Sequence, residues 1–207
     1  MIQSLDENVG RLMAALDETG LADRTIVVFA SDNGGNMYNR VDGETPTSNA
    51  PLRNGKGSIY EGGVRTPCVV IWPGVVQGGA KSEAVVSSVD WYPTLLEMTG
   101  VPSRPGQRFD GISIVPALRG GALKREAIFC HFPHYIAATG NLPSTSVRQG
   151  DWKLIRFYCD NDDQSDRFEL YDLRRDIGET TDLAAKEPAR VAAMGALIAG
   201  FLRDTGA

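Results

Sequence analysis

The spacing of hydrophobic positions divides this chain into a first part that alternates helix with strand and a second part of short strands. In residues 2–19 apolar side chains recur every three or four positions, which predicts an amphipathic helix ending at Gly20. The apolar, β-branched runs 25–31 and 64–72 predict two buried strands, which we expect to run parallel within an α/β sheet. A further helix is predicted over 90–100, where Asp and Gly occupy the two ends.

The second part has a shorter rhythm. Polar turns separate four strand-like runs, which predicts an antiparallel sheet of about four strands, at 126–132, 145–149, 152–158 and 168–172. Pro188 opens a final helix whose apolar side chains fall on one face. The predicted fold class is therefore α/β. We expect part of an α/β/α mixed-sheet domain at 1–122 and an antiparallel subdomain with a terminal helix at 123–207, divided in a loop-rich stretch.

Composition narrows the classes of protein and of partner. The 207 residues are 42% hydrophobic and 23% charged, which is ordinary for a globular chain of one large or two small domains. A net charge of −5 with scattered Lys and Arg argues against nucleic acid or an anionic membrane as partner. No apolar run approaches the ~20 residues of a membrane span. Three widely spaced cysteines form neither a disulfide framework nor a zinc signature.

Candidate metal ligands follow the first predicted strand. The run 25–31 stops at the letters DNGG, so that Asp32 and Asn33 lie where a buried strand ends. Open α/β sheets build their sites at the carboxyl ends of strands. Carboxylate and amide oxygens are hard ligands that suit Ca²⁺ or Mg²⁺. Asn-Gly and Asp-Gly pairs are also common turn formers, so a simple turn remains the alternative.

A candidate anion-binding residue lies further along. Lys56 sits between two glycines, so that its ammonium can approach an anion without crowding from neighbouring side chains. A lone lysine is more commonly a solvated surface charge. Together with the oxygen ligands, Lys56 indicates a site for an oxyanion such as sulfate or phosphate. We expect the loop 36–55 to line this site, and Arg65 to have a structural role, for example beside Glu61.

These stretches resemble the C-terminal portion of sulfatases of the arylsulfatase type, in the alkaline-phosphatase superfamily. The resemblance is carried by TIVVFASDNGG (25–35), GKGSIYEGGVRTP (55–67), SSVDWYPTLLEMTG (87–100), DGISIVPALRG (110–120), GDWKLI (150–155) and ELYDLRRDIGETTDLA (169–184). It implies an alkaline-phosphatase-like α/β/α mixed sheet followed by a small four-stranded subdomain. It also implies sulfate-ester hydrolysis, with Asp32 and Asn33 as ligands of Ca²⁺ (Mg²⁺ in some members) and Lys56 binding the sulfate.

The two histidines lie in the letters CHFPH. This segment resembles one that reaches the pocket rim in many bacterial sulfatases, which implies that His131 and His134 contact substrate. The alternative is a pair of half-buried histidines in a sheet. The acidic stretch 160–166 lacks the glycine and terminal Glu of an EF-hand loop, and we expect a solvated loop there. Lys153 is expected to face solvent.

The nucleophile of the family is not encoded in this chain. Sulfatases carry C-x-P-x-R or S-x-P-x-R, in which the Cys or Ser becomes formylglycine, and neither pattern occurs here. We therefore expect a fragment that binds metal weakly, is inactive alone, and lacks the amino-terminal half with its formylglycine. The expected partner of the intact enzyme is a sulfate-ester small molecule or glycan. We expect no nucleic acid or membrane partner, and a homo-oligomer formed through an exposed sheet edge. Intact members are often periplasmic, secreted or lysosomal.

Two alternatives stay open. One is a phosphatase or phosphonate hydrolase of the same superfamily, although its members tend to place a histidine where this chain has Asn33. The other is a non-catalytic module that associates with itself.

Overall fold

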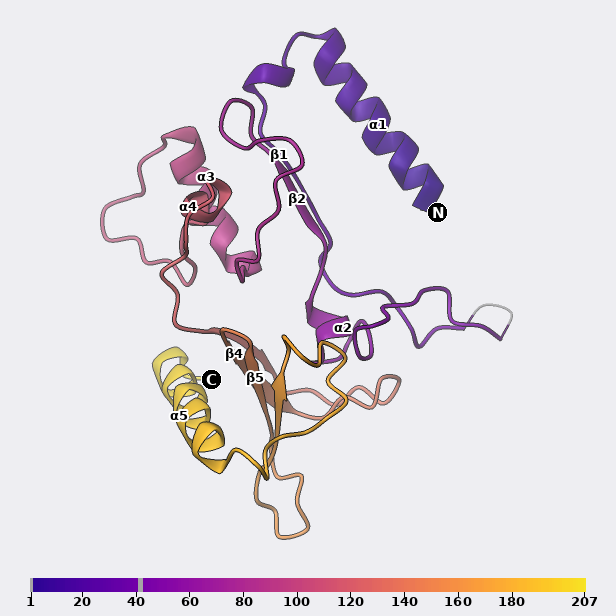
Figure 1. Cartoon of the computed structure of the whole chain (residues 1–207), viewed down its shortest axis with the longest axis vertical. Helices are drawn as coiled ribbons and strands as arrows, with labels where there is room; N and C mark the ends of the chain where they lie inside the picture. The colour runs from indigo at the N-terminus through magenta and orange to yellow at the C-terminus, as the bar shows by residue number, and fades with distance from the viewer. Residues whose placement is uncertain (1, 41–42) are drawn as a thin grey trace. The chain divides into compact units, whose positions relative to one another are not determined.

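The computed structural model describes residues 2–40 and 43–207 and divides the chain into two compact units (Figure 1). The first unit contains the residues up to Ala30 together with Cys68–Leu123, and the second contains Ser31–Pro67 together with Lys124–Ala207. The segment between the two apolar runs thus groups with the C-terminal residues. The division into domains at 1–122 and 123–207 stays a prediction.

The first unit contains a two-stranded sheet and a set of helical segments. Its elements are α1 (Ile2–Glu18), η1 (Ala22–Arg24), β1 (Val27–Ala30), β2 (Cys68–Ile71), η2 (Ser88–Asp90), α3 (Trp91–Thr99) and α4 (Val115–Leu118). The helices predicted over 2–19 and 90–100 are confirmed. Helix α3 ends at Gly100, whose φ of 69° is left-handed, as expected of a glycine that terminates a helix.

The pairing of β1 with β2 corrects two expectations. The strands are antiparallel, with Val27 opposite Ile71 and Ala30 opposite Cys68, so the prediction of parallel strands was wrong. Side chains alternate with the same period in both arrangements, so hydrophobic spacing does not reveal direction. The strands are also largely exposed rather than buried, because an apolar run is buried only where another element covers it.

The second unit contains the predicted four-stranded antiparallel sheet. Its elements are α2 (Glu61–Val64), β3 (Ile128–Phe132), β4 (Ser144–Gln149), β5 (Trp152–Phe157), β6 (Arg167–Asp172) and α5 (Pro188–Thr205). The strands follow the order β3-β4-β5-β6. The prediction of this sheet and of a final helix opened by Pro188 is confirmed. The short helix α2 was not predicted, because its sequence, EGGV, contains two poor helix formers.

Each face of this sheet packs against a different layer. One cluster joins α5 to the strands and consists of Val147, Leu154, Leu170, Met194 and Ile198. The other consists of Ile59, Ile155, Phe157, Tyr171 and Leu173. Successive residues of a strand point to opposite faces, so Leu154 faces α5 while Ile155 faces Ile59. The loop that carries Lys56 is thereby anchored on the sheet by a buried apolar side chain.

In the part of the chain that the structure describes, no helix combines the length and apolar character needed to cross a membrane. The three cysteines are free thiols.

Candidate functional site

The two loops that carry the predicted site residues are joined through their backbones. The Gly34 amide donates to the carbonyl of Gly63 at 3.0 Å, and the Lys56 amide donates to the carbonyl of Gly35 at 3.0 Å. The Asn49 side chain adds a clamp: it accepts from the Gly35 amide and donates to the Gly35 carbonyl, both at 3.0 Å. The structure therefore brings the loop of Asp32 and Asn33 beside the loop of Lys56.

The glycines of these loops are required by close approach of one backbone to another. A Cβ at Gly34 would lie 1.6 Å from the carbonyl oxygen of Gly62. A Cβ at Gly62 would lie 2.1 Å from the Asn54 carbonyl oxygen, and one at Gly63 would lie 2.1 Å from that of Ser58. No side chain fits at any of these three positions, which gives the DNGG and YEGG letters a steric explanation.

Asp32 and Asn33 present oxygen atoms suited to a hard cation. Asp32 is exposed. Among the described residues, none donates a hydrogen bond to its carboxylate or forms an ion pair with it. The Asn33 amide nitrogen donates to the Gly34 carbonyl at 2.9 Å, which leaves the amide oxygen as the free acceptor. The pair fits Ca²⁺ or Mg²⁺ in chemistry but not in number, since Ca²⁺ takes about six to eight oxygens. Across residues 2–40 and 43–207, no group of three or more His, Cys, Asp or Glu could hold a metal.

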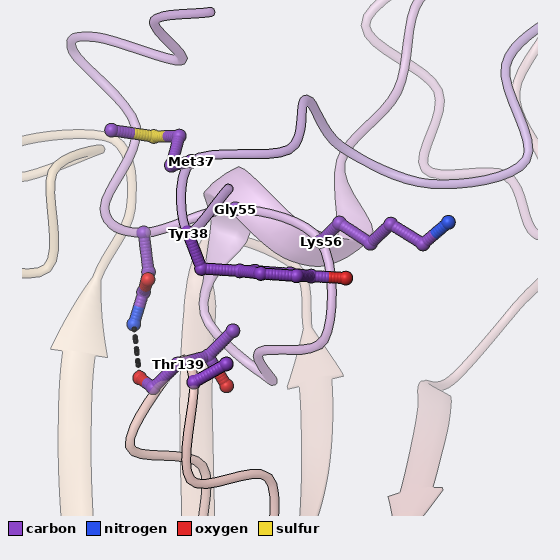
Figure 2. A pocket seen from close by; sticks show the side chains of 7 residues that line it. Met37, Tyr38, Gly55, Lys56 and Thr139 are labelled. Carbon is purple, nitrogen blue, oxygen red and sulfur yellow. Dashed lines mark hydrogen bonds between the residues drawn. The ribbon is translucent and has the colours of Figure 1, made fainter. Parts of the chain in front are cut away.

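Lys56 borders a small open pocket of about 90 Å³ (Figure 2). The pocket is lined by Met37, Tyr38, Asn54, Gly55, Lys56, Ala138 and Thr139. Figure 2 shows the Lys56 side chain extending away from Thr139, so that its ammonium stays free of the pocket wall. Lys56 is exposed. An exposed cation on a loop fixed at its backbone can neutralise an anion that binds beside it.

The wall of the pocket opposite the Lys56 loop comes from the segment after β3. Thr139 donates its hydroxyl to the Gly57 carbonyl at 2.8 Å and accepts at its own carbonyl from Asn54 at 3.3 Å, the contact dashed in Figure 2. The buried Asn141 accepts from the Ile59 amide at 3.1 Å. Neither Asn49 nor Asn141 was predicted from sequence, because a single Asn within a loop carries no distinguishing pattern.

The histidines occupy different environments. His131, on β3, is half-buried, and its Nδ1 lies 2.7 Å from the Thr145 hydroxyl, which also contacts the Tyr158 hydroxyl. His134 follows the strand and is exposed, while its carbonyl accepts from the Asn141 amide nitrogen at 3.1 Å. Asn141 therefore links the His134 backbone to the loop of Lys56. Contact of either histidine with substrate stays a prediction.

A cluster on β6 holds the segment just after Lys56. The hydroxyls of Tyr60 and Tyr171 donate to Glu169 Oε2 at 2.8 and 2.7 Å. Burial, followed by these bonds, raises the pKa values of both tyrosines. Burial also acts to raise the pKa of Glu169, but the bonds from Tyr171, Tyr60 and Arg167 outweigh it and lower that pKa. Glu169 is therefore held as an anion.

The environment of Lys153 differs from the one expected from the sequence. This lysine was expected in solvent, yet its side chain is only 2% exposed and contacts the carboxylates of Glu61 and Glu179. A lysine is ordinarily a surface residue, so only the tertiary structure reveals the acidic partners of Lys153. The expected structural role of Arg65 is consistent with its guanidinium, 3.7 Å from Glu61. In the acidic stretch, Asp160 and Asp166 pair with Arg167 and Arg156, while the two aspartates between them are exposed.

Comparison with known proteins places the chain among sulfatases. A family model described as Sulfatase matches residues 1–101, and one described as N-sulphoglucosamine sulphohydrolase, C-terminal, matches residues 54–195. A Sulfatase of Formosa agariphila is 38% identical over 91% of this chain and 35% of its own length. Arylsulfatase A of Homo sapiens is 34% identical over 88% of this chain and 38% of its own length.

Solved structures give the same result for the fold. The crystal structure of i-CgsB in complex with k-i-k-neocarrahexaose has a TM-score of 0.81 at 28% identity, over 97% of this chain and 41% of that one. A protein in complex with its substrate D-glucosamine-2-N,6-O-disulfate has a TM-score of 0.78 at 27% identity, over 98% and 39%. Phosphonate monoester hydrolase of Agrobacterium radiobacter has a TM-score of 0.72 at 27% identity, over 99% and 40%.

The chain spans 35% and 38% of the lengths of those two curated relatives. The second family model covers more than half of the 207 residues, and the residues that both models match include Lys56 and the letters YEGG. This chain, with its α/β first unit and its four-stranded antiparallel sheet, belongs to the sulfatase family and corresponds to the C-terminal portion of its members.

Proposed function

We propose that this chain supplies the sulfate-binding lysine and part of the metal site of an enzyme that hydrolyses sulfate esters. The observation that supports the proposal is the backbone junction between the two loops, in which Gly34 and Gly35, the residues that follow Asp32 and Asn33, bond to Gly63 and Lys56. Sulfatases in general use a divalent metal ion and formylglycine. The 207 residues contain neither C-x-P-x-R nor S-x-P-x-R, so they provide binding groups and not the nucleophile.

Each residue has a distinct role in this proposal. The Lys56 ammonium neutralises a sulfate oxygen and stabilises the charge that develops as the ester bond breaks. Asp32 and the amide oxygen of Asn33 hold the cation, which when bound polarises the sulfate oxygens. The exposed His134 can reach an incoming molecule, and His131, beside Thr145, is available to orient the leaving group. A sulfated sugar is one substrate class supported by the disulfated glucosamine bound in a relative.

Phosphonate ester hydrolysis is the second candidate, because a phosphonate monoester hydrolase superposes on 99% of the chain with a TM-score of 0.72. Sulfate is favoured because an amide, Asn33, follows Asp32 where the phosphatase-type relatives tend to carry a histidine. Both reactions would use Lys56 as the anion-binding residue, so the substituted lysine alone does not separate them. The ester that the enzyme cleaves faster, sulfate or phosphonate, separates the two reactions.

The activity test uses a hybrid enzyme in which residues 1–207 follow the amino-terminal part of the Formosa agariphila relative. Lys56→Ala should lower kcat/KM for an aryl sulfate by about 10²- to 10³-fold, the cost of removing one group that stabilises transition-state charge. Lys186→Ala, an equal change at an exposed lysine of the same unit, should leave the rate unchanged. Equal activity of the two variants would contradict the role of Lys56, and faster cleavage of a phosphonate monoester would favour the second candidate.

The metal test uses the 207-residue chain itself. Two side-chain oxygens supply a fraction of the ligands that Ca²⁺ needs, so we expect a dissociation constant on the order of 10⁻⁴ M or weaker by calorimetry. Asp32→Ala should abolish this binding, whereas Asp162→Ala, at another exposed aspartate of the same unit, should preserve it. The same chain should show no sustained turnover of an aryl sulfate. Submicromolar binding that survives Asp32→Ala would refute the proposed ligand.

A further inference from the structure

Three of the sequence stretches that resemble sulfatases meet in one buried charge cluster. Glu61 comes from the letters YEGG, Lys153 from GDWKLI and Glu179 from DIGET. The Lys153 ammonium lies 3.0 Å from Glu61 Oε1 and 2.8 Å from Glu179 Oε1. The side chains of Glu61 and Glu179 are 4% and 0% exposed. Nothing in the proposed chemistry uses these three residues, so their burial calls for a separate explanation.

Stability alone does not explain the buried charge cluster. Removing charges from water costs several kcal/mol per ion, and apolar side chains of similar volume are often as stable or more so. Burial indeed raises the pKa of Glu179, against the attraction of Lys153, so the cost of holding this carboxylate as an anion is visible. Charged partners do add geometric specificity, because short charge-assisted hydrogen bonds hold the groups that form them in one arrangement.

Glu179 holds both ends of the segment that carries Lys56. Its carboxylate accepts from the Glu61 amide at 2.6 Å, after Lys56, and its carbonyl accepts from the Arg53 guanidinium at 3.0 Å, before Lys56. Arg53 also lies over the Tyr60 ring at 3.7 Å, which closes the segment on itself. The two ends of the loop are therefore tied to a single residue that is fixed against Lys153 of β5.

The backbone of Glu179 has an uncommon conformation for its residue type. Its φ of 52° lies in the left-handed region, where glycine or asparagine would be accommodated at lower cost. A glutamate in this conformation carries backbone strain, which its carboxylate contacts can offset. The carboxylate contacts Lys153 and the Glu61 amide, so these contacts are the explanation that the structure provides.

The cluster reaches the site loops through α2. Glu61 is the first residue of this helix, and the next two residues are the glycines against which both loops rest. The Gly62 amide donates to the Arg53 carbonyl at 2.9 Å, and the Gly63 carbonyl accepts from Gly34 at 3.0 Å. Gly63 also leaves no room beside the Ser58 and Gly55 carbonyls. A displacement of Glu61 would therefore move the surfaces that support Lys56 and Asn33 together.

We infer that Glu61, Lys153 and Glu179 are positioning residues, which fix the Lys56 loop and the Asp32–Asn33 loop relative to the sheet; the inference rests on the proposed function for what these loops bind. Arg148 and Arg65 lie 3.6 and 3.7 Å from Glu61 Oε2 and balance the second negative charge of the cluster. The cluster thus links the segments YEGG, GDWKLI and DIGET. Together these segments hold the proposed anion-binding loop in a single conformation.

The experiment measures amide hydrogen exchange of the 207-residue chain by NMR. The triple variant Glu61→Gln, Lys153→Met, Glu179→Gln removes all three charges of the cluster together. Arg148 and Arg65 lose their carboxylate partner in this variant, and Glu179→Gln alone, which leaves Glu61 with its basic partners, is the milder change. We expect exchange at the Gly34 and Lys56 amides to accelerate about tenfold relative to that at Leu154 of β5. Lys186→Met, the same lysine change at an exposed position, should leave this ratio unchanged.

A second measurement separates positioning from folding. Sulfate is titrated into each folded variant while the Lys56 amide shift is followed, and the triple variant should need about tenfold more sulfate than the wild type, a change typical of losing preorganisation. Equal acceleration of loop and sheet amides in either variant would overturn the inference, because the cluster would then only support the fold. A wild-type chain whose Lys56 amide ignores sulfate would instead refute the proposed function and leave the exchange result to decide on positioning.

Discussion

The two sheets of this molecule share strand direction and some residue types but lie in opposite environments. Both are antiparallel and both contain β-branched residues, yet Val69 of β2 is 56% exposed while Val147 of β4 is 0% exposed. The difference lies in what covers them. Val147 packs with Met194 and Ile198 of α5, whereas β1 and β2 pair only with each other among the described residues. An apolar strand thus specifies its conformation locally and its burial only through a partner.

Polar groups show the same contrast. The larger sheet buries charged and hydroxyl side chains and gives them partners, as Glu169 shows with Tyr60 and Tyr171. The two-stranded sheet is apolar on both faces, with the sequences VVFA and CVVI. The Lys56 loop rests on the larger sheet through Ile59 and Glu61. The loop that we propose to bind an anion is therefore built on the sheet with the more complete packing.

The same substitution in each sheet tests whether the two sheets differ in burial, and it should give the largest effect. Val147→Ala should lower the free energy of unfolding by about 2–3 kcal/mol, from lost methyl burial and the cavity left behind. Val69→Ala should change it by less than about 0.5 kcal/mol, because most of that side chain is already in water. Urea unfolding followed by circular dichroism measures both. Equal losses would mean that β2 is covered in solution as completely as β4.

Much of the fold could be predicted from the sequence, since helical and strand periodicity identify the elements that α1, α3, α5 and the four strands of the larger sheet became. Direction and burial could not, because the pairing of β1 with β2 has no signature in single-residue patterns. Helix α2 was missed for a related reason. It is held by the Glu61 amide bonding Glu179, a contact across 118 positions, rather than by helix propensity.

The arrangement of the candidate site could be predicted from the sequence only in part. The sequence indicated the two loops, because DNGG and GKG are recognisable motifs, and the structure joins these loops through backbone hydrogen bonds. The supports were not predictable: Lys153 looked like a solvent-facing lysine, and Asn49 and Asn141 looked like ordinary loop residues. Each has its role only through partners outside its own local motif, which lie 14 positions away for Asn49, 82 for Asn141 and 92 for Lys153. Groups that bind a ligand recur as motifs, whereas the groups that position them are visible mainly in three dimensions.

The pH dependence of the unfolding free energy tests the contribution of the buried polar groups around Glu169 in the larger sheet. The pKa of Glu169 is lowered in the folded chain, so its stabilisation is present above its ordinary value of 4.5 and is lost as the pH falls through the folded value. At neutral pH Glu169→Gln should lower the free energy of unfolding by about 1.5 kcal/mol, typical of bonds to a charged group. The difference from wild type should shrink below pH 4.5.

Unfolding curves at several pH values measure this difference. Asp162→Asn, at an exposed acidic residue of the same unit, is the matched control and should show no pH-dependent difference from wild type. A difference for Glu169→Gln that is constant from acid to neutral pH would show that the tyrosines bind Glu169 equally well when it is protonated.

The smallest effect is expected at the exposed sheet, where the predicted homo-oligomer would form. Phe29 and Val69 are directly opposite each other in the register of β1 and β2 and are 41% and 56% exposed. Each strand also has an outer edge that no described residue pairs, and unpaired edges and apolar patches recruit other chains. We expect the 207-residue chain to associate with itself through these strands.

The double variant Phe29→Ser, Val69→Ser should weaken this association about tenfold, with little change in the unfolding of the larger sheet. Sedimentation over a range of concentrations measures the dissociation constant. Tyr135→Ser, which changes a side chain 78% exposed in the second unit, is the control and should leave association unchanged. Hydrogen exchange then shows whether β1 is covered, because its amides should slow as concentration rises while those of β5 do not change. A strictly monomeric wild type with slow exchange throughout β1 would mean that two strands suffice to protect one another, and the contrast between the sheets would then lie in side-chain burial alone.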